Sequence, residues 1–141
     1  MITRLLSGLV CLVAAALVVD LFFRWTEGGG EFSFAVSGLD SIPGFVTFAA
    51  GLMLFLWELL GLAGVRRTLV ADSLVAFFLA GAAGIGGIAN VVHLRWGETG
   101  PTDVDLAVAA LLAIPLSILL LAGAAAHLSI HVLASRPPAA R

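Results

Sequence analysis

Four long apolar segments, separated by short charged gaps, constrain what this chain can fold into more than any other feature. They are Leu5–Phe23, Ile42–Val65, Leu69–Leu94 and Val104–Leu133. Each is about as long as the roughly 20 residues that a helix needs to cross a bilayer, or longer. Only 11% of the residues are charged, whereas about a quarter are charged in a soluble domain. We therefore predict an all-α membrane protein, a four-helix transmembrane bundle over residues 1–134 with a flexible cytoplasmic tail at 135–141.

The arginines predict the orientation of these helices. All seven basic residues are arginine, and the orientation rule places the side richer in Lys and Arg in the cytoplasm. Arg24 follows the first segment and Arg95 follows the third. The other five lie on the opposite side: Arg4 at the N-terminus, Arg66 and Arg67 between segments two and three, and Arg136 and Arg141 in the tail. We predict a multi-pass protein of a bacterial cytoplasmic membrane with both termini in the cytoplasm.

Local signals mark several helix ends. The first segment runs through Asp20 to Phe23 without an Ala-x-Ala-like cleavage site, so we expect a retained helix and not a signal peptide. Asp40 or Ser41 can cap the second helix. Thr102–Asp105 fits a capping box, with an acid in place of the usual Glu, for the fourth.

The first outer gap has a strand-like pattern. Glu31–Ser37 alternates large apolar residues with small or polar ones, a period of two that is typical of strands. Gly28–Gly30 can turn this segment back onto Trp25–Glu27 as a short β-hairpin. The alternative is an irregular loop that dips Phe32 and Phe34 into the membrane interface.

Two segments echo each other. Val18–Trp25 and Val91–Trp96 share the pattern Val-Val-x-Leu-Arg-Trp once two phenylalanines are removed from the first. The echo predicts two pseudo-repeated helical hairpins, although Trp25 and Trp96 also suit the membrane interface as anchors. Small residues in the third segment predict a close helix-packing face, and its members are Ala80, Gly84 and Gly87.

Ionisable and polar groups inside the segments are the candidate functional residues, because a charge in lipid costs several kcal/mol. The inner, cytoplasmic group comprises Glu58, Asp72, His127 and His131. Anchoring at the interface, a partner or proton-linked role, and metal binding are the three interpretations, and we expect no metal. The deepest acid is Glu58, and His127 is its expected partner if Glu58 faces the bundle.

An outer group lies near the opposite ends of the helices. Its members are Asp20, Arg24, Asn90, His93 and Arg95. Asp20 and Arg24 are four residues apart, the spacing of a helical ion pair. The alternatives are a structural pair at the interface and a site for an external cation or a partner protein.

The sequence contains no nucleophile motif, zinc signature or phosphate-binding loop, and no basic stripe for nucleic acid. We therefore expect no enzyme and no cofactor. The leading hypothesis is a non-catalytic accessory or assembly subunit of a larger membrane complex, with a membrane-protein partner or a second copy of itself. The alternative is a small proton- or cation-linked transporter that uses Glu58 with His127 and His131. A third hypothesis for the function is a haem-binding electron-transfer subunit.

The first half of the chain resembles small uncharacterised four-helix integral membrane proteins of actinobacteria. The resemblance rests on Asp20–Trp25, on the outer segment through Ser37–Asp40 and on the apolar second helix. It implies a fold and a location in the membrane, and it transfers no functional residue.

Overall fold

A computed structural model describes residues 2–28, 35–65, 70–96, 104–106 and 108–135. It contains four long helices: α1 (Ile2–Asp20), α2 (Ile42–Leu62), α3 (Val70–Trp96) and α4 (Val108–Ala134). Each helix is long and apolar enough to span a membrane. The predicted four long apolar helices are therefore confirmed, and they are compatible with a multi-pass membrane protein.

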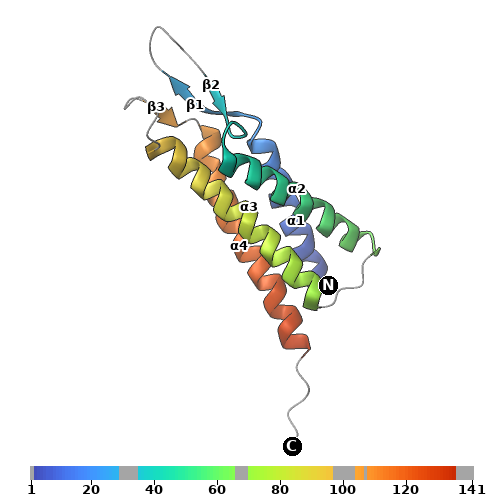
Figure 1. Ribbon diagram of the computed structural model, residues 1–141. Coiled ribbons are helices and arrows are strands. Elements are labelled where there is room, and N and C mark those ends of the chain that lie inside the picture. Colours follow the sequence, from blue (N-terminus) through green and yellow to red (C-terminus); the bar gives the residue numbers. More distant parts are fainter. Residues whose placement is uncertain (1, 29–34, 66–69, 97–103, 107, 136–141) are drawn as a thin grey trace, which may run out of the picture.

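The helices form a closed bundle in which each packs against two neighbours (Figure 1). α1 contacts α2 and α4, and α3 contacts the same two helices. Large apolar side chains cover the outward faces of all four helices, including those of Leu12, Met53, Phe78 and Leu111. Such an apolar exterior on every side is what a lipid environment requires of a bundle.

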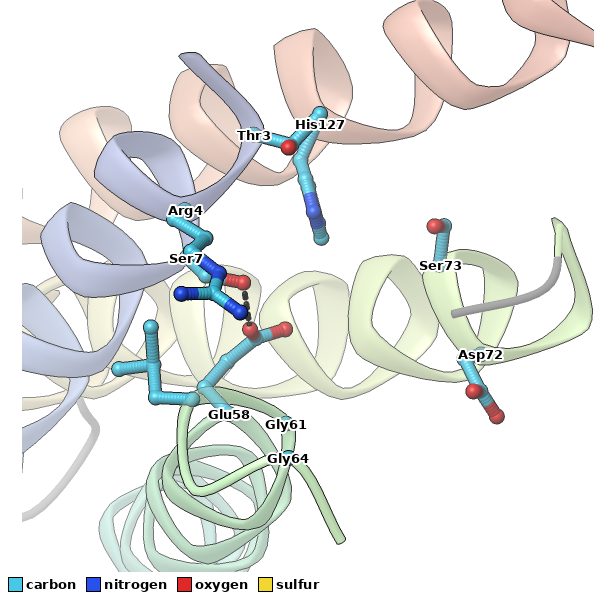
Figure 2. A pocket seen from close by; sticks show the side chains of 10 residues that line it. Thr3, Arg4, Ser7, Glu58, Gly61, Gly64, Asp72, Ser73 and His127 are labelled. Atoms are coloured by element: carbon cyan, nitrogen blue, oxygen red, sulfur yellow. Dashed lines mark hydrogen bonds between the residues drawn. The ribbon is translucent and has the colours of Figure 1, made fainter. Parts of the chain in front are cut away.

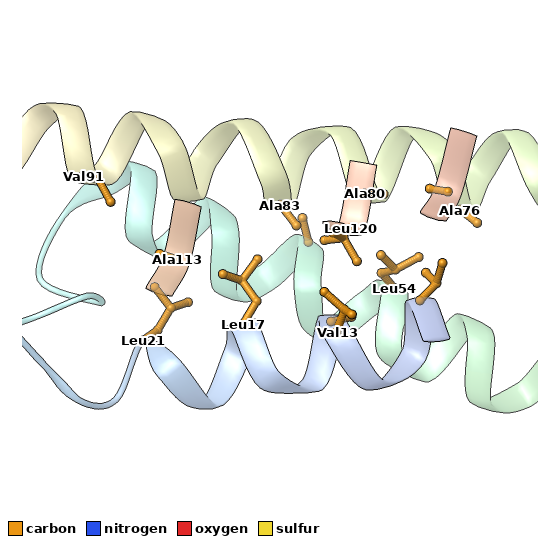
Figure 3. Packing of buried hydrophobic residues seen from close by; sticks show 14 of the residues in the cluster. Val13, Leu17, Leu21, Leu54, Ala76, Ala80, Ala83, Val91, Ala113 and Leu120 are labelled. Atoms are coloured by element: carbon orange, nitrogen blue, oxygen red, sulfur yellow. The ribbon is translucent and has the colours of Figure 1, made fainter. Parts of the chain in front are cut away.

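The centre of the bundle combines a few leucines with many small residues (Figure 3). Leu17, Leu54 and Leu120 are fully buried. Ala80, Gly84 and Gly87 of α3 are also buried, and a Cβ atom on Gly87 would lie 2.6 Å from the Ser117 hydroxyl oxygen of α4. Small residues thus let α3 approach its neighbours closely.

Three short strands cover one end of the bundle: β1 (Arg24–Gly28), β2 (Ala35–Ser37) and β3 (Val104–Leu106). They form an antiparallel sheet in the order β2-β1-β3. The connection between β1 and β2, which includes Phe32 and Phe34, lies outside the described residues, so the hairpin as a whole stays a prediction. The echo between α1 and α3 likewise stays a prediction.

The observed helix ends differ from the predicted ones in places. α1 ends at Asp20 and α4 begins at Val108, four residues later than predicted, because Val104–Leu106 pairs with β1. Ser41 is the N-cap of α2, and its hydroxyl accepts a hydrogen bond from the Gly44 amide at 2.9 Å. At the other end of α2, Gly64 adopts a φ of +75°, a left-handed conformation that glycine adopts without steric cost.

Candidate functional site

A polar pocket of about 340 Å³ lies at the end of the bundle where α1 and α3 begin and α2 ends (Figure 2). All four helices contribute to its wall. The lining residues are Thr3, Arg4, Ser7, Glu58, Gly61, Leu62, Gly64, Asp72, Ser73 and His127. Three residues of the predicted inner group, Glu58, Asp72 and His127, are therefore brought together in one pocket.

Glu58 is the deepest acid of the pocket, with only 1% of its surface exposed. It lies on the buried stripe of α2, which runs through Thr47, Gly51 and Leu54 at helical spacing. The Ser7 hydroxyl of α1 donates a hydrogen bond to Glu58 Oε2 at 2.5 Å. The other carboxylate oxygen, Oε1, is buried and has no hydrogen-bond partner. A buried polar atom without a partner costs about 1–3 kcal/mol, so Oε1 is an acceptor that a ligand can satisfy.

Ser73 provides a second polar atom of this kind. Its side chain, in the first turn of α3, is 2% exposed, and its Oγ has no hydrogen-bond partner. Ser7 and Ser73 thus present hydroxyl groups to the pocket from α1 and α3. The sequence did not single out Ser7, Ser73 or Thr3, because hydroxyl groups are common in apolar helices, and it placed Arg4 on the cytoplasmic side without assigning it to a site. The available signal was the position of Ser7 on the buried stripe that continues through Val10 and Ala14.

The two inner histidines differ in position. His127 is buried and lines the pocket, whereas His131 is half-buried and does not. Their rings are in edge-to-face contact, with centroids 4.8 Å apart and an interplanar angle of 84°. Asp72 lies half-buried at the pocket wall, and its backbone carbonyl accepts a hydrogen bond from Trp57 Nε1 at 3.3 Å. His131 therefore belongs to the pocket only through His127.

The pocket has an apolar floor. One helical turn further into the bundle from Ser7, Glu58, Ser73 and His127, each helix carries a buried apolar residue; these residues are Val10, Leu54, Ala76 and Ala124. The same apolar cluster continues along the bundle axis through Leu17 and Leu120. An apolar layer therefore separates the pocket from Thr47 and Ser117, which are buried polar residues further along the bundle.

The described members of the predicted outer group, Asp20, Asn90 and His93, do not line this pocket. Asn90 is fully buried, its Nδ2 donates to the Gly38 carbonyl oxygen at 2.7 Å, and its Oδ1 accepts from the Ser41 hydroxyl at 2.5 Å. These bonds fix the segment before α2 onto α3, which is a structural role. Asp20 is buried at the end of α1, and His93 is exposed. The predictions for Arg24, Arg95, Trp25 and Trp96 concern side chains outside the described part of the chain.

The geometry also bears on metal and haem binding. Among the described residues, no group of three or more His, Cys, Asp or Glu side chains is suited to hold a metal ion. His93 follows Ser73 by twenty residues on one helix, which corresponds to about 30 Å. His93 and the pocket residue His127 therefore lie near opposite ends of the bundle and are too far apart to ligate one haem.

Comparisons with known proteins give no family for this chain. No protein-family model matches the sequence, and no curated protein or solved structure matches it either. The function is therefore argued from the pocket alone.

Proposed function

We propose that this chain is a non-catalytic multi-pass protein of a bacterial cytoplasmic membrane, with both termini in the cytoplasm. The arginine distribution supports this orientation, because the five arginines of the richer side include Arg4, Arg66 and Arg67. Arg4 lines the pocket, and in the sequence the other two stand between α2, which ends at the pocket, and α3, which begins there. In this orientation the pocket opens to the cytoplasm and the sheet lies outside.

We further propose that the protein is an accessory or assembly subunit that binds a polar group of a partner in this pocket. The observation that carries the proposal is the buried Glu58 Oε1, an oxygen without a hydrogen-bond partner on a side chain that lines the pocket. A partner group that donates to this oxygen removes the cost of leaving it unsatisfied. The apolar floor formed by Val10, Leu54, Ala76 and Ala124 favours binding over passage through the bundle.

Co-purification tests this function. The tagged chain is extracted from its host membrane in a gentle detergent, and the proteins that accompany it are quantified by mass spectrometry. We expect a membrane protein to co-purify with the wild type and to fall at least about tenfold with Glu58→Gln, because truncating a buried charged contact costs several kcal/mol. The control is Asp40→Asn, which alters an exposed acid near the opposite end of α2.

Two outcomes would contradict the accessory role. One is a wild-type chain that purifies alone as a stable oligomer. The other is a partner whose yield is the same with Glu58→Gln as with the wild type.

A proton- or cation-linked transporter is the second candidate, because Glu58 and His127 line the same pocket and His131 contacts His127. Transport requires the apolar floor beneath the pocket to open during the cycle. Reconstituted liposomes test this function: a proton or cation flux that Glu58→Gln abolishes supports it, and a wild type without flux excludes it.

Two finer structural proposals accompany this function. We propose that β1 and β2 belong to one β-hairpin, which their antiparallel pairing supports. We also propose that the α1–α2 and α3–α4 hairpins descend from a duplication. Support comes from Val18-Val19 and Val91-Val92, which lie towards the C-terminal ends of α1 and α3, at the same end of the bundle.

A further inference from the structure

We propose that the polar group bound in the Glu58 pocket is a protonated primary amine, supplied either by a lysine side chain of a partner or by a free small amine. The inference rests on the proposed function, because it names the chemistry of the group that the pocket receives.

Three buried polar atoms of the pocket are able to accept a hydrogen bond. Glu58 Oε1 has no donor. The Ser7 hydroxyl uses its proton on Glu58 Oε2, which leaves its oxygen lone pairs available. Ser73 Oγ adds a further acceptor without a partner. An ammonium group carries three N–H donors and no acceptor, so it complements this set, directly or through a water molecule.

The placement of charged groups in the pocket also favours a cation. Its wall contains two carboxylates, Glu58 and Asp72, and one guanidinium, that of Arg4. Arg4 is exposed whereas Glu58 is buried, so the carboxylate, and not the guanidinium, is the more deeply buried of these two charged groups.

Other cations fit this acceptor set less well. A guanidinium group binds a carboxylate best through two parallel hydrogen bonds, and one of the two Glu58 oxygens already accepts from Ser7. The described residues offer no trio of side chains suited to a metal ion. A quaternary ammonium ion carries the same single positive charge as a protonated primary amine. It has no N–H group that can donate a hydrogen bond to Glu58 Oε1.

A thermal-stability assay tests the proposal on the purified full chain in detergent. The unfolding midpoint is followed by tryptophan fluorescence while ethylammonium chloride or tetramethylammonium chloride is added at equal ionic strength. We expect a saturable rise with ethylammonium and an affinity at least tenfold weaker for tetramethylammonium. Glu58→Gln should weaken ethylammonium binding at least tenfold, whereas Asp40→Asn should leave it unchanged.

Two further variants keep the test informative if Glu58→Gln does not fold. Ser73→Ala removes one acceptor and should weaken ethylammonium binding about two- to tenfold. Arg4→Gln removes a like charge beside the site and should strengthen binding. The proposal is overturned if both ammonium ions bind equally, if Glu58→Gln binds as the wild type does, or if Ser73→Ala and Arg4→Gln leave the affinity unchanged.

The same probe distinguishes the source of the amine and separates this inference from the proposed function. If ethylammonium releases a co-purified partner, the amine is a lysine side chain of that partner. If ethylammonium binds although no partner co-purifies, the inference stands for a free amine and the accessory role fails. If a partner co-purifies in a Glu58-dependent manner but ethylammonium neither binds nor releases it, the inference fails and the accessory role stands.

Discussion

The Ser7 hydroxyl of α1 donates a hydrogen bond to the Glu58 carboxylate of α2 across 51 residues of sequence. Both side chains are buried, and together they join two helices at the pocket end of the bundle. The bond satisfies one carboxylate oxygen, and the other oxygen has no hydrogen-bond partner. This arrangement makes Glu58 both a structural link and the candidate binding group.

Ser7→Ala should destabilise the bundle by about 1–3 kcal/mol, because it leaves a buried carboxylate oxygen without its donor. The matched control is Ser129→Ala, which removes an exposed hydroxyl that bonds to the Ala125 carbonyl oxygen of its own helix. Unfolding in detergent, compared for the two variants, measures the difference. Equal stability of both variants would show that the contact between α1 and α2 contributes little.

Asn90→Ala should also destabilise the protein by about 1–3 kcal/mol, because the Gly38 carbonyl loses its side-chain donor and the Ser41 hydroxyl loses its acceptor. His93→Ala, at an exposed position one turn further along α3, serves as the control and should have little effect. The free energy of unfolding of each variant tests this prediction. If His93→Ala lowers the free energy of unfolding as much as Asn90→Ala does, the structural role assigned to Asn90 is contradicted.

Two glycines give opposite predictions for the same substitution. A Cβ atom on Gly44 would overlap the backbone carbonyl oxygen of Gly38, whereas a Cβ atom on Gly8 would meet nothing within 4 Å. Gly44→Ala should therefore prevent the normal packing of α2. Gly8→Ala should stabilise α1 by about 0.5–1 kcal/mol, because alanine has the higher helix propensity. Expression level and unfolding midpoint measure both effects, and a stable Gly44→Ala variant would contradict the close approach of Gly44 to the Gly38 backbone.

The long apolar segments were sufficient to predict the four helices, since length and hydropathy determine where a chain can cross a bilayer. The burial of Glu58 also follows from the sequence, because it continues the helical stripe of Thr47, Gly51 and Leu54. β3 was missed because Val104–Leu106 is a strand only through its pairing with β1, far away in the sequence.

The pocket itself could be predicted only in part. Glu58, Asp72 and His127 were identifiable as ionisable groups inside apolar segments. Ser7 and Ser73 were not identified, because a serine is recognisable as a pocket residue only once helix packing shows which side chains face one another. The role of Asn90 depends on its hydrogen bond to the Gly38 backbone carbonyl. The pattern of side chains in a sequence does not show which backbone carbonyl a side chain will contact, so this role was not predictable.

The most direct test of the account is the side of the membrane on which the pocket opens. In a Cys11→Ser background, Ala63→Cys places a thiol at the exposed pocket end of α2, and Asp40→Cys places one at the exposed opposite end. The account predicts that a membrane-impermeant maleimide labels Asp40→Cys in intact cells and Ala63→Cys only in inverted membrane vesicles. Labelling of Ala63→Cys in intact cells, or labelling of both thiols from the same side, would contradict a bundle that spans the bilayer with its Glu58 pocket open to the cytoplasm.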